Sequence, residues 1–144
     1  MRRSVDLSAW PDLVVVYLGF RVTRLRGVAA VLGLGRGIND VARNKPDGLL
    51  AHESVFFGLT HIGMRQYWRD LESLERFTRS EPHRTWWRDF LKGGSGAGFW
   101  QTYRVKGGME AVYIDMPGPV GFGLFAEARR PEGPFMSARQ RLAA

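Results

Sequence analysis

The sequence predicts a single α+β domain whose elements follow the order β-α-β-β-α-β, the split βαβ or ferredoxin-like plan. Strand-like and helix-like segments alternate along the chain, turn signals separate them, and a length of 144 residues suits one domain. We expect this domain to fill residues 1–144. Irregular arms are expected at residues 1–11 and 116–144, because the second arm is rich in proline and glycine and has little hydrophobic periodicity.

The first half of the plan is a strand, a helix and a hairpin. Residues 13–22 contain the β-branched and aromatic run V-V-V-Y, which predicts a central strand. Residues 24–43 carry apolar side chains at helical spacing, but three glycines in this window predict a kinked or broken helix. Strands predicted over residues 49–59 and 62–68 are close enough in sequence to form an antiparallel hairpin. The three glycines are Gly33, Gly35 and Gly37.

The second half adds two short helices and two short strands. Asp70 is suited to capping a helix over residues 71–79. Pro82 stops or restarts this helix, and a second helical piece is expected over residues 84–92. Strands over residues 99–105 and 110–114 complete the pattern.

The composition excludes several classes of site. The chain has no cysteine, so thiol nucleophiles, zinc–thiolate sites and iron–sulfur clusters are excluded. Its three histidines are scattered and show no metal-binding spacing. The glycine-rich stretches have neither GxGxxG spacing nor a Walker lysine. We therefore expect no bound cofactor and no metal.

The charge distribution and the hydropathy of the chain argue against nucleic-acid and membrane partners. The net charge is +7, but the basic residues are spread along the chain, so we expect no nucleic-acid partner. The longest apolar stretch, residues 13–20, is far shorter than the roughly 20 residues needed to span a bilayer. The first residues have no apolar core of a secretory signal. These features favour a cytoplasmic protein without a membrane partner.

Strand alternation selects candidate binding residues. It places His52, Ser54 and Phe56 on one face of their strand, and Met64, Gln66 and Trp68 on one face of the next. The opposite face of the second strand carries Arg65 and Arg69 beside Tyr67, so we expect that face to be exposed to solvent. The first two sets combine hydrogen-bonding groups with aromatic walls, as a small-molecule site requires. We expect them to line a pocket between the sheet and the helices.

The many aromatic residues in the middle of the chain suggest further walls for a flat, hydrophobic substrate. Trp86 and Trp100 are the candidates. His52, Tyr67 or His83 would supply the base or polar contact. An aromatic core or a subunit interface explains the same composition, and a structural role explains His83 equally well.

Three stretches carry a resemblance to a known family: residues 13–22, residues 63–77 with the Tyr-Trp-Arg run at 67–69, and residues 108–117. Together with His83 and Trp87, they make residues 13–125 similar to the small bacterial and fungal monooxygenase-like family, which is related to the antibiotic-biosynthesis monooxygenases. The resemblance implies a dimeric α+β barrel, in which two ferredoxin-like protomers pack their sheets together. A homodimer is therefore expected.

The resemblance leaves several functions open. It implies, first, cofactor-independent oxygenation of a hydrophobic, polyketide-like secondary metabolite, in which the substrate supplies the electrons. A cyclase or pericyclase that folds a polyene in the same cavity is the alternative. Haem-binding relatives ligate iron through a histidine near this helix junction, and His83 is the position that matches. A non-catalytic ligand-binding module would use the aromatic residues only for packing.

Overall fold

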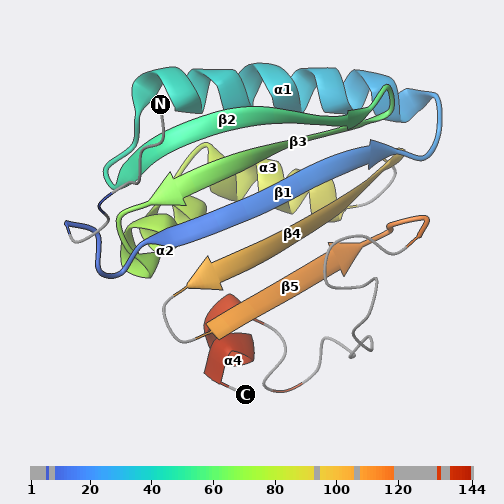
Figure 1. Cartoon of the computed structure of the whole chain (residues 1–144). Helices are drawn as coiled ribbons and strands as arrows, with labels where there is room; N and C mark the ends of the chain where they lie inside the picture. The colour runs from blue at the N-terminus through green and yellow to red at the C-terminus, as the bar shows by residue number, and fades with distance from the viewer. Residues whose placement is uncertain are drawn as a thin grey trace, which may run out of the picture.

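Five antiparallel strands form one sheet with the order β2-β3-β1-β4-β5. The computed structural model describes residues 6, 9–92, 95–105, 108–118, 133 and 137–143. The elements, in chain order, are β1 (Val14–Val22), α1 (Arg26–Asn44), β2 (Leu49–Gly58), β3 (His61–Trp68), α2 (Leu71–Arg79), α3 (His83–Leu91), β4 (Ala97–Val105), β5 (Gly108–Ile114) and α4 (Ala138–Ala143). Figure 1 shows α1 along the β2 side, α2 and α3 behind the sheet, and α4 near β5.

The ferredoxin-like prediction is confirmed. Strand β1 is central and pairs antiparallel with both β3 and β4. Strands β2 and β3 form the predicted hairpin, with His52 opposite Gln66. The strand predicted over residues 110–114 is confirmed as β5, which pairs with β4 at the edge of the sheet. The four-stranded core therefore has the expected topology, extended by one strand.

The expected break in the first helix is wrong. Helix α1 runs unbroken through its three central glycines. Its inner side chains Val31 and Ile38 pack in the core cluster that also contains Met64 and Phe99. This packing outweighs the roughly 1 kcal/mol by which each glycine disfavours a helix interior.

Two of those glycines have different surroundings, which gives a testable contrast. A Cβ atom at Gly33 would meet nothing within 4 Å, whereas one at Gly37 would lie 2.6 Å from the Trp86 Cζ2 atom. We expect Gly33→Ala to raise the free energy of unfolding by about 0.5–1 kcal/mol. Gly37→Ala should lower it, because α1 or the indole must move. Chemical denaturation of both variants measures the difference, and equal stabilisation by the two would contradict this packing.

The predicted N-cap of α2 is confirmed. The Asp70 carboxylate Oδ1 accepts a hydrogen bond from the Ser73 backbone N–H at 2.7 Å. This bond is the main cause that lowers the pKa of Asp70. The cap fixes where α2 leaves β3, and so where the α2 side chains meet the sheet.

The C-terminal arm is not irregular throughout. Helix α4 lies within it, and the Arg139 guanidinium donates to both carboxylate oxygens of Glu75 on α2, at 3.2 and 2.8 Å. The rest of this arm beyond residue 118, apart from residues 133 and 137, and most of the N-terminal arm lie outside the described residues. Helix α4 thus corrects the expectation for its own residues only.

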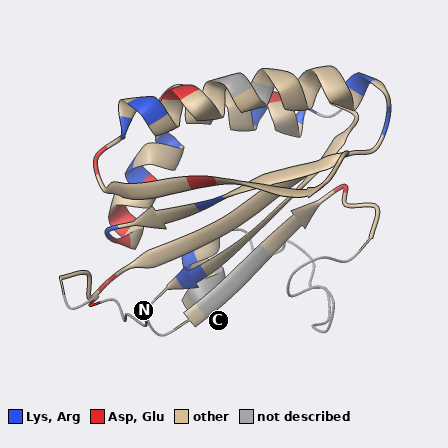
Figure 2. Cartoon of the chain, turned by 45° about the horizontal axis from the view of Figure 1, so that its top comes forward, with Lys and Arg blue, Asp and Glu red and all other residues tan. Residues whose placement is uncertain are grey.

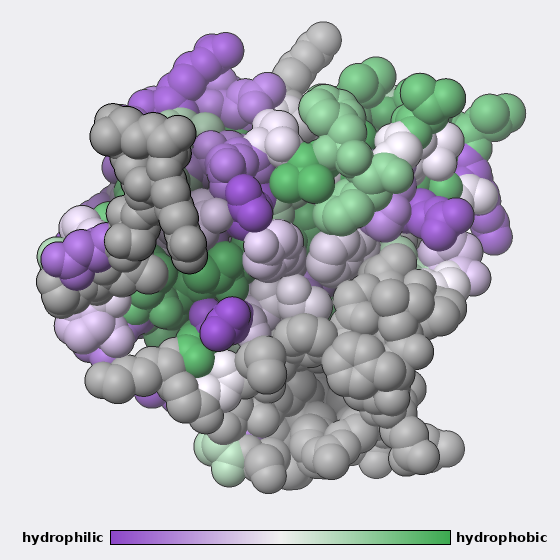
Figure 3. Space-filling view, viewed as in Figure 1, coloured by the Kyte–Doolittle hydropathy of each residue, from purple (hydrophilic) through white to green (hydrophobic). Residues whose placement is uncertain are grey.

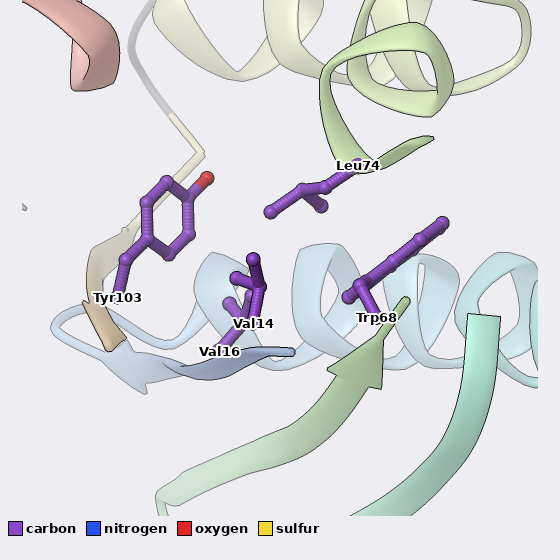
Figure 4. Close-up of a cluster of buried hydrophobic side chains, with 5 residues drawn as sticks. All are labelled: Val14, Val16, Trp68, Leu74 and Tyr103. Carbon is purple, nitrogen blue, oxygen red and sulfur yellow. The ribbon is translucent and has the colours of Figure 1, made fainter. Parts of the chain in front are cut away.

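The core lies between the sheet and the helices. Figure 4 shows its best-buried part, where Trp68 and Leu74 face Val14, Val16 and Tyr103. The Trp68 side chain has no exposed surface. The inner face of the sheet is therefore packed at the Trp68 end. Among the described residues, no helix is both long and apolar enough to cross a membrane.

Candidate functional site

A cavity of about 640 Å³ lies between the inner face of the sheet and the helices. Its floor consists of side chains from β1, β3 and β4, its walls come from α1, α2 and α3, and α4 borders it. Most of its surface is aliphatic or aromatic, with a few polar groups among them. A volume of this size suits a drug-sized organic molecule.

His83 lines this cavity at the start of α3. Its Nδ1 atom lies 3.1 Å from the Thr78 carbonyl oxygen, and its ring packs edge-on against Phe77. A carbonyl only accepts, so Nδ1 carries the proton and donates. Burial lowers the pKa of His83, which favours the neutral ring, and the contact with the Thr78 carbonyl partly opposes this. The Nε2 lone pair is then left without a partner among the described residues.

Gln66 presents a fixed amide to the floor of the cavity. Its Oε1 atom accepts a hydrogen bond from Trp68 Nε1 at 3.1 Å, and its Nε2 atom donates to His52 Nδ1 at 3.2 Å. The amide nitrogen can only donate, so His52 Nδ1 must accept and the proton of the neutral ring sits on Nε2. Burial lowers the pKa of His52, which favours this neutral form. Trp68 and His52 together hold the orientation of Gln66.

Gln101 is the second amide on the floor. It lies on β4 opposite Leu18 of β1 and Val112 of β5, and it lines the cavity. No hydrogen bond joins its side chain to another described residue. Its amide is therefore available to a ligand in the middle of the cavity.

One border of the cavity is charged. Glu75 lines it and pairs with Arg139 at 2.8 Å and with Arg79 at 3.5 Å. Both arginine side chains are well exposed, whereas the Glu75 side chain is mostly covered. The cavity thus grades from aromatic walls to a polar border beside α2 and α4.

A smaller cavity of about 140 Å³ lies between α1 and the β2–β3 hairpin. His52 and Ser54 line it together with Asn39 and Met64. The His52 Nε2 atom is buried and has no hydrogen-bond partner. A donor in this state is satisfied by a water molecule or by a ligand atom.

The structure distributes the predicted site residues over four places: the larger cavity, the smaller cavity, the core and the outer face of the sheet. Four line the larger cavity, namely Met64, Gln66, His83 and Trp86. Three line the smaller one together with Met64, namely His52, Ser54 and Phe56, of which Phe56 is largely exposed at its rim. Trp68 lies behind Gln66 in the core and lines neither cavity.

Trp100 and Tyr67 lie on the other face of the sheet, which corrects their expected place in the pocket. Trp100 pairs with Gly19 across β1, and its indole covers that glycine, where a Cβ atom would be 2.6 Å from Nε1. Tyr67 follows Gln66 on β3 and therefore points the opposite way, where Arg65 lies 5.6 Å from its ring. Neither side chain can contact a molecule held between the sheet and the helices.

Sequence reasoning missed several cavity residues: Phe77, Phe99, Gln101 and Tyr103. Alternation along β4 places the last three on one face, opposite Trp100. Both faces of β4 carry aromatic side chains, so composition did not reveal which face pointed inward. In the described part of the chain, no group of three or more acidic or histidine side chains is arranged to hold a metal ion.

Comparison with known proteins supplies a family and a fold. Residues 13–122 match the family model described as "Monooxygenase af470-like". The fold is similar to that of an aldoxime dehydratase crystallised with butyraldoxime, with 23% identity and a TM-score of 0.53 over 77% of this chain and 33% of that one. A second aldoxime dehydratase is 19% identical with a TM-score of 0.51, covering 89% of this chain and 42% of that one.

A third similar structure is a conserved protein of unknown function from Bacteroides thetaiotaomicron. It is 9% identical with a TM-score of 0.53, covering 66% of this chain and 98% of that one. At these identities the structural matches show the fold alone. The chain spans about a third of the length of the first aldoxime dehydratase. No curated protein matches the sequence.

Proposed function

Because the chain belongs to the monooxygenase af470-like family, we propose that it is an enzyme that oxygenates a hydrophobic small molecule in the larger cavity. The observation that carries the proposal is His83. Its Nδ1 atom is anchored to the Thr78 carbonyl, which leaves Nε2 as a base at the edge of a 640 Å³ cavity. A ring-bearing molecule of polyketide-like size is the substrate class that fits the aromatic walls.

The proposed reaction needs no electrons from the protein. A methylene group made acidic by a neighbouring ketone loses a proton to His83 Nε2 and becomes an enolate, which O₂ then oxidises. The net change is CH₂ + O₂ → C=O + H₂O, so the electrons come from the two C–H bonds and one oxygen atom leaves as water. Gln101 would donate a hydrogen bond to the enolate oxygen as its charge develops, whereas the Gln66 amide nitrogen already donates to His52 Nδ1 and Met64 Sδ.

A tricyclic ketone with an acidic methylene tests this proposal. We expect the purified protein to accelerate conversion of anthrone to anthraquinone, with one O₂ consumed per product molecule. Gln101→Phe should reduce this activity at least tenfold, because the new ring fills the centre of the cavity floor and removes an amide donor. Oxygen uptake and absorbance are the measurements. Anthrone binding without any oxidation would contradict the oxygenase and favour a binding or cyclising role.

A haem-dependent enzyme is the second candidate, favoured by the same histidine. An imidazole whose Nδ1–H is held by a carbonyl and whose Nε2 faces an apolar cavity is the arrangement found for metal-bound histidines. His83 would hold the iron, and the haem would supply oxygen activation at this position. Helices α2 and α3 would then exclude water through Phe77, Trp86 and Trp87.

We also propose that the outer face of the sheet pairs two copies of the chain. Phe57, His61 and Trp100 form an aromatic cluster there: the Phe57 and His61 rings stack at 4.7 Å, and Trp100 Nε1 donates to His61 Nε2 at 2.8 Å. Tyr17 and Phe57 are partly exposed on the same face. A second sheet laid on this face would cover both.

Sedimentation velocity checks this pairing. We expect a dimer at micromolar concentration and a monomer for Tyr17→Glu, because the substitution places one carboxylate from each copy in the interface. The new carboxylate would still accept from Arg65, which lies 3.2 Å from the Tyr17 hydroxyl, so the fold should persist. Leu91→Glu, at the end of α3, is the control and should stay dimeric. A monomeric parent protein would contradict the pairing.

A further inference from the structure

One end of the molecule exposes an unusual number of large apolar side chains. We call this set the apolar end: Leu25, Val28, Leu32, Phe56 and Leu59. Leu25 is 93% exposed, Leu59 is 106% exposed and Phe56 is 80% exposed. Side chains exposed to this extent stand clear of their neighbours. They do not belong to the core, and their exposure needs another explanation.

The five side chains lie together although they come from two segments. Leu25 is the N-cap of α1, and Leu59 is in the turn that joins β2 to β3. The Val22 backbone N–H donates to the Thr60 carbonyl at 2.9 Å, which ties the end of β1 to that turn. Figure 1 shows the start of α1 and the β2–β3 turn side by side, and Figure 3 shows apolar side chains gathered at this end.

Three arginines border the apolar end. Arg21, Arg24 and Arg26 are exposed, and none of them forms an ion pair with another described residue. Most other arginines of the described chain are paired with a carboxylate, as Arg65 is with Glu53. Figure 2 shows the positive charge where α1 begins. Asp115 follows β5, and its backbone carbonyl lies beside Gly98, the β4 residue that pairs with Arg21, but no ion pair joins it to these arginines among the described residues.

We infer that the apolar end docks the protein on an anionic lipid bilayer. The exposed leucines and Phe56 would enter the boundary between headgroups and acyl chains, and the three arginines would contact the negative headgroups. This inference stands apart from the proposed reaction, because no residue of the apolar end lines the larger cavity.

Charge and shape favour a bilayer over other occupants. A second copy of this chain, packed patch to patch about a twofold axis, would bring the same arginines of both copies together without carboxylates between them. Leucines that are almost fully exposed form a convex tip, whereas stable protein interfaces need a complementary packed surface. A convex apolar tip with a basic border is what a bilayer surface accepts.

This inference differs from the expectation of no membrane partner. That expectation rested on the length of apolar sequence needed to span a bilayer, which can be judged from consecutive residues. Surface docking depends on side chains from two segments that are distant in the sequence, such as Leu25 and Leu59. Their proximity appears only in the folded chain.

Vesicle co-sedimentation with the full chain tests the inference. We expect binding to vesicles of phosphatidylcholine with 30% phosphatidylglycerol, and little binding to phosphatidylcholine alone. The double variant Leu25→Glu/Leu59→Glu should lose at least tenfold in affinity, whereas Leu91→Glu, another exposed leucine, should bind as the parent does. Arg24→Glu should lose about fivefold or more, and Arg43→Glu, at the other end of α1, should lose much less.

Other outcomes overturn the inference. Equal binding by Leu25→Glu/Leu59→Glu and the parent would show that the apolar end is not the docking surface. An absence of binding to anionic vesicles would contradict the inference, and an acidic protein would then be the candidate partner for the apolar end. A parent dimer that Leu25→Glu/Leu59→Glu converts to monomers would show that a second copy covers the patch. Circular dichroism of each variant confirms that it is folded before the vesicles are added.

Discussion

Replacing Trp68 with alanine should lower the free energy of unfolding by about 3–5 kcal/mol, and so unfold much of the protein near physiological temperature. The indole is completely buried and packs against Phe77 at a ring-centroid distance of 5.2 Å. Its loss leaves a large cavity beside Val14 and Leu74. It also removes the donor that Gln66 Oε1 accepts from, which leaves a buried polar atom unpaired.

Two further variants separate packing from hydrogen bonding. Trp68→Phe keeps most of the ring but removes the N–H group, so we expect an intermediate loss of stability and a disordered Gln66. Trp10→Ala is the matched control, because that tryptophan precedes β1 and is partly exposed. Urea denaturation measures all three free energies of unfolding. A Trp68→Ala protein as stable as the parent would contradict the observed packing.

His83→Asn should reduce oxygenation by about 10²–10⁴-fold, which is the usual effect of removing a general base. Asparagine retains an N–H donor for the Thr78 carbonyl, so the start of α3 should keep its position. His61→Ala is the control, because that ring lies on the outer face against Trp100. His52→Ala should cost less than His83→Asn, because His52 faces the smaller cavity.

The pH dependence of the reaction follows from the state of His83. Burial lowers its pKa below the ordinary 6.5, so the ring is neutral and basic at pH 7. We expect the rate to be constant around neutrality and to fall only when the pH drops through this lowered pKa. Steady-state rates between pH 4.5 and 8 check the profile. A rate that rises steeply above pH 7 would exclude His83 as the base.

The same variant distinguishes the two candidate chemistries. A purified or haem-reconstituted protein with a Soret band that His83→Asn removes would favour the haem enzyme. Oxidation of anthrone by a colourless protein that His83→Asn inactivates would favour the cofactor-independent reaction. Full activity in His83→Asn would contradict both roles of this histidine.

The fold could be predicted because strand alternation, turn residues and the helix cap all indicated the same ferredoxin-like arrangement. The alternation in β3 correctly placed Met64, Gln66 and Trp68 toward the helices, since the arginines on the other face of the strand favour contact with water. The cap at Asp70 was visible because its chemistry is local. The continuity of α1 was not visible, because the packing that supports it comes from residues distant in sequence.

The site was predictable only in part, for a similar reason. Residues on β2 and β3 could be assigned to a face by the polar residues between them. On β4, the face of Trp100 depends on the glycine opposite it on β1, which gives room for the indole. The hydrogen bonds that hold Gln66 and His83 join partners whose nearness depends on the fold. Such contacts have no signature in a single sequence.

Ligand binding in the larger cavity is coupled to the docking of helix α4 on the rest of the domain. Residues 137–140 border the larger cavity, and a helix of six residues has no stability of its own in water. Consider a ligand that touches both α4 and the sheet. Its binding raises the equilibrium constant for α4 docking by a certain factor, and a docked α4 raises the affinity for the ligand by the same factor. The Arg139–Glu75 ion pair therefore contributes to affinity by holding α4 in place, in addition to any contact that either side chain makes in the cavity.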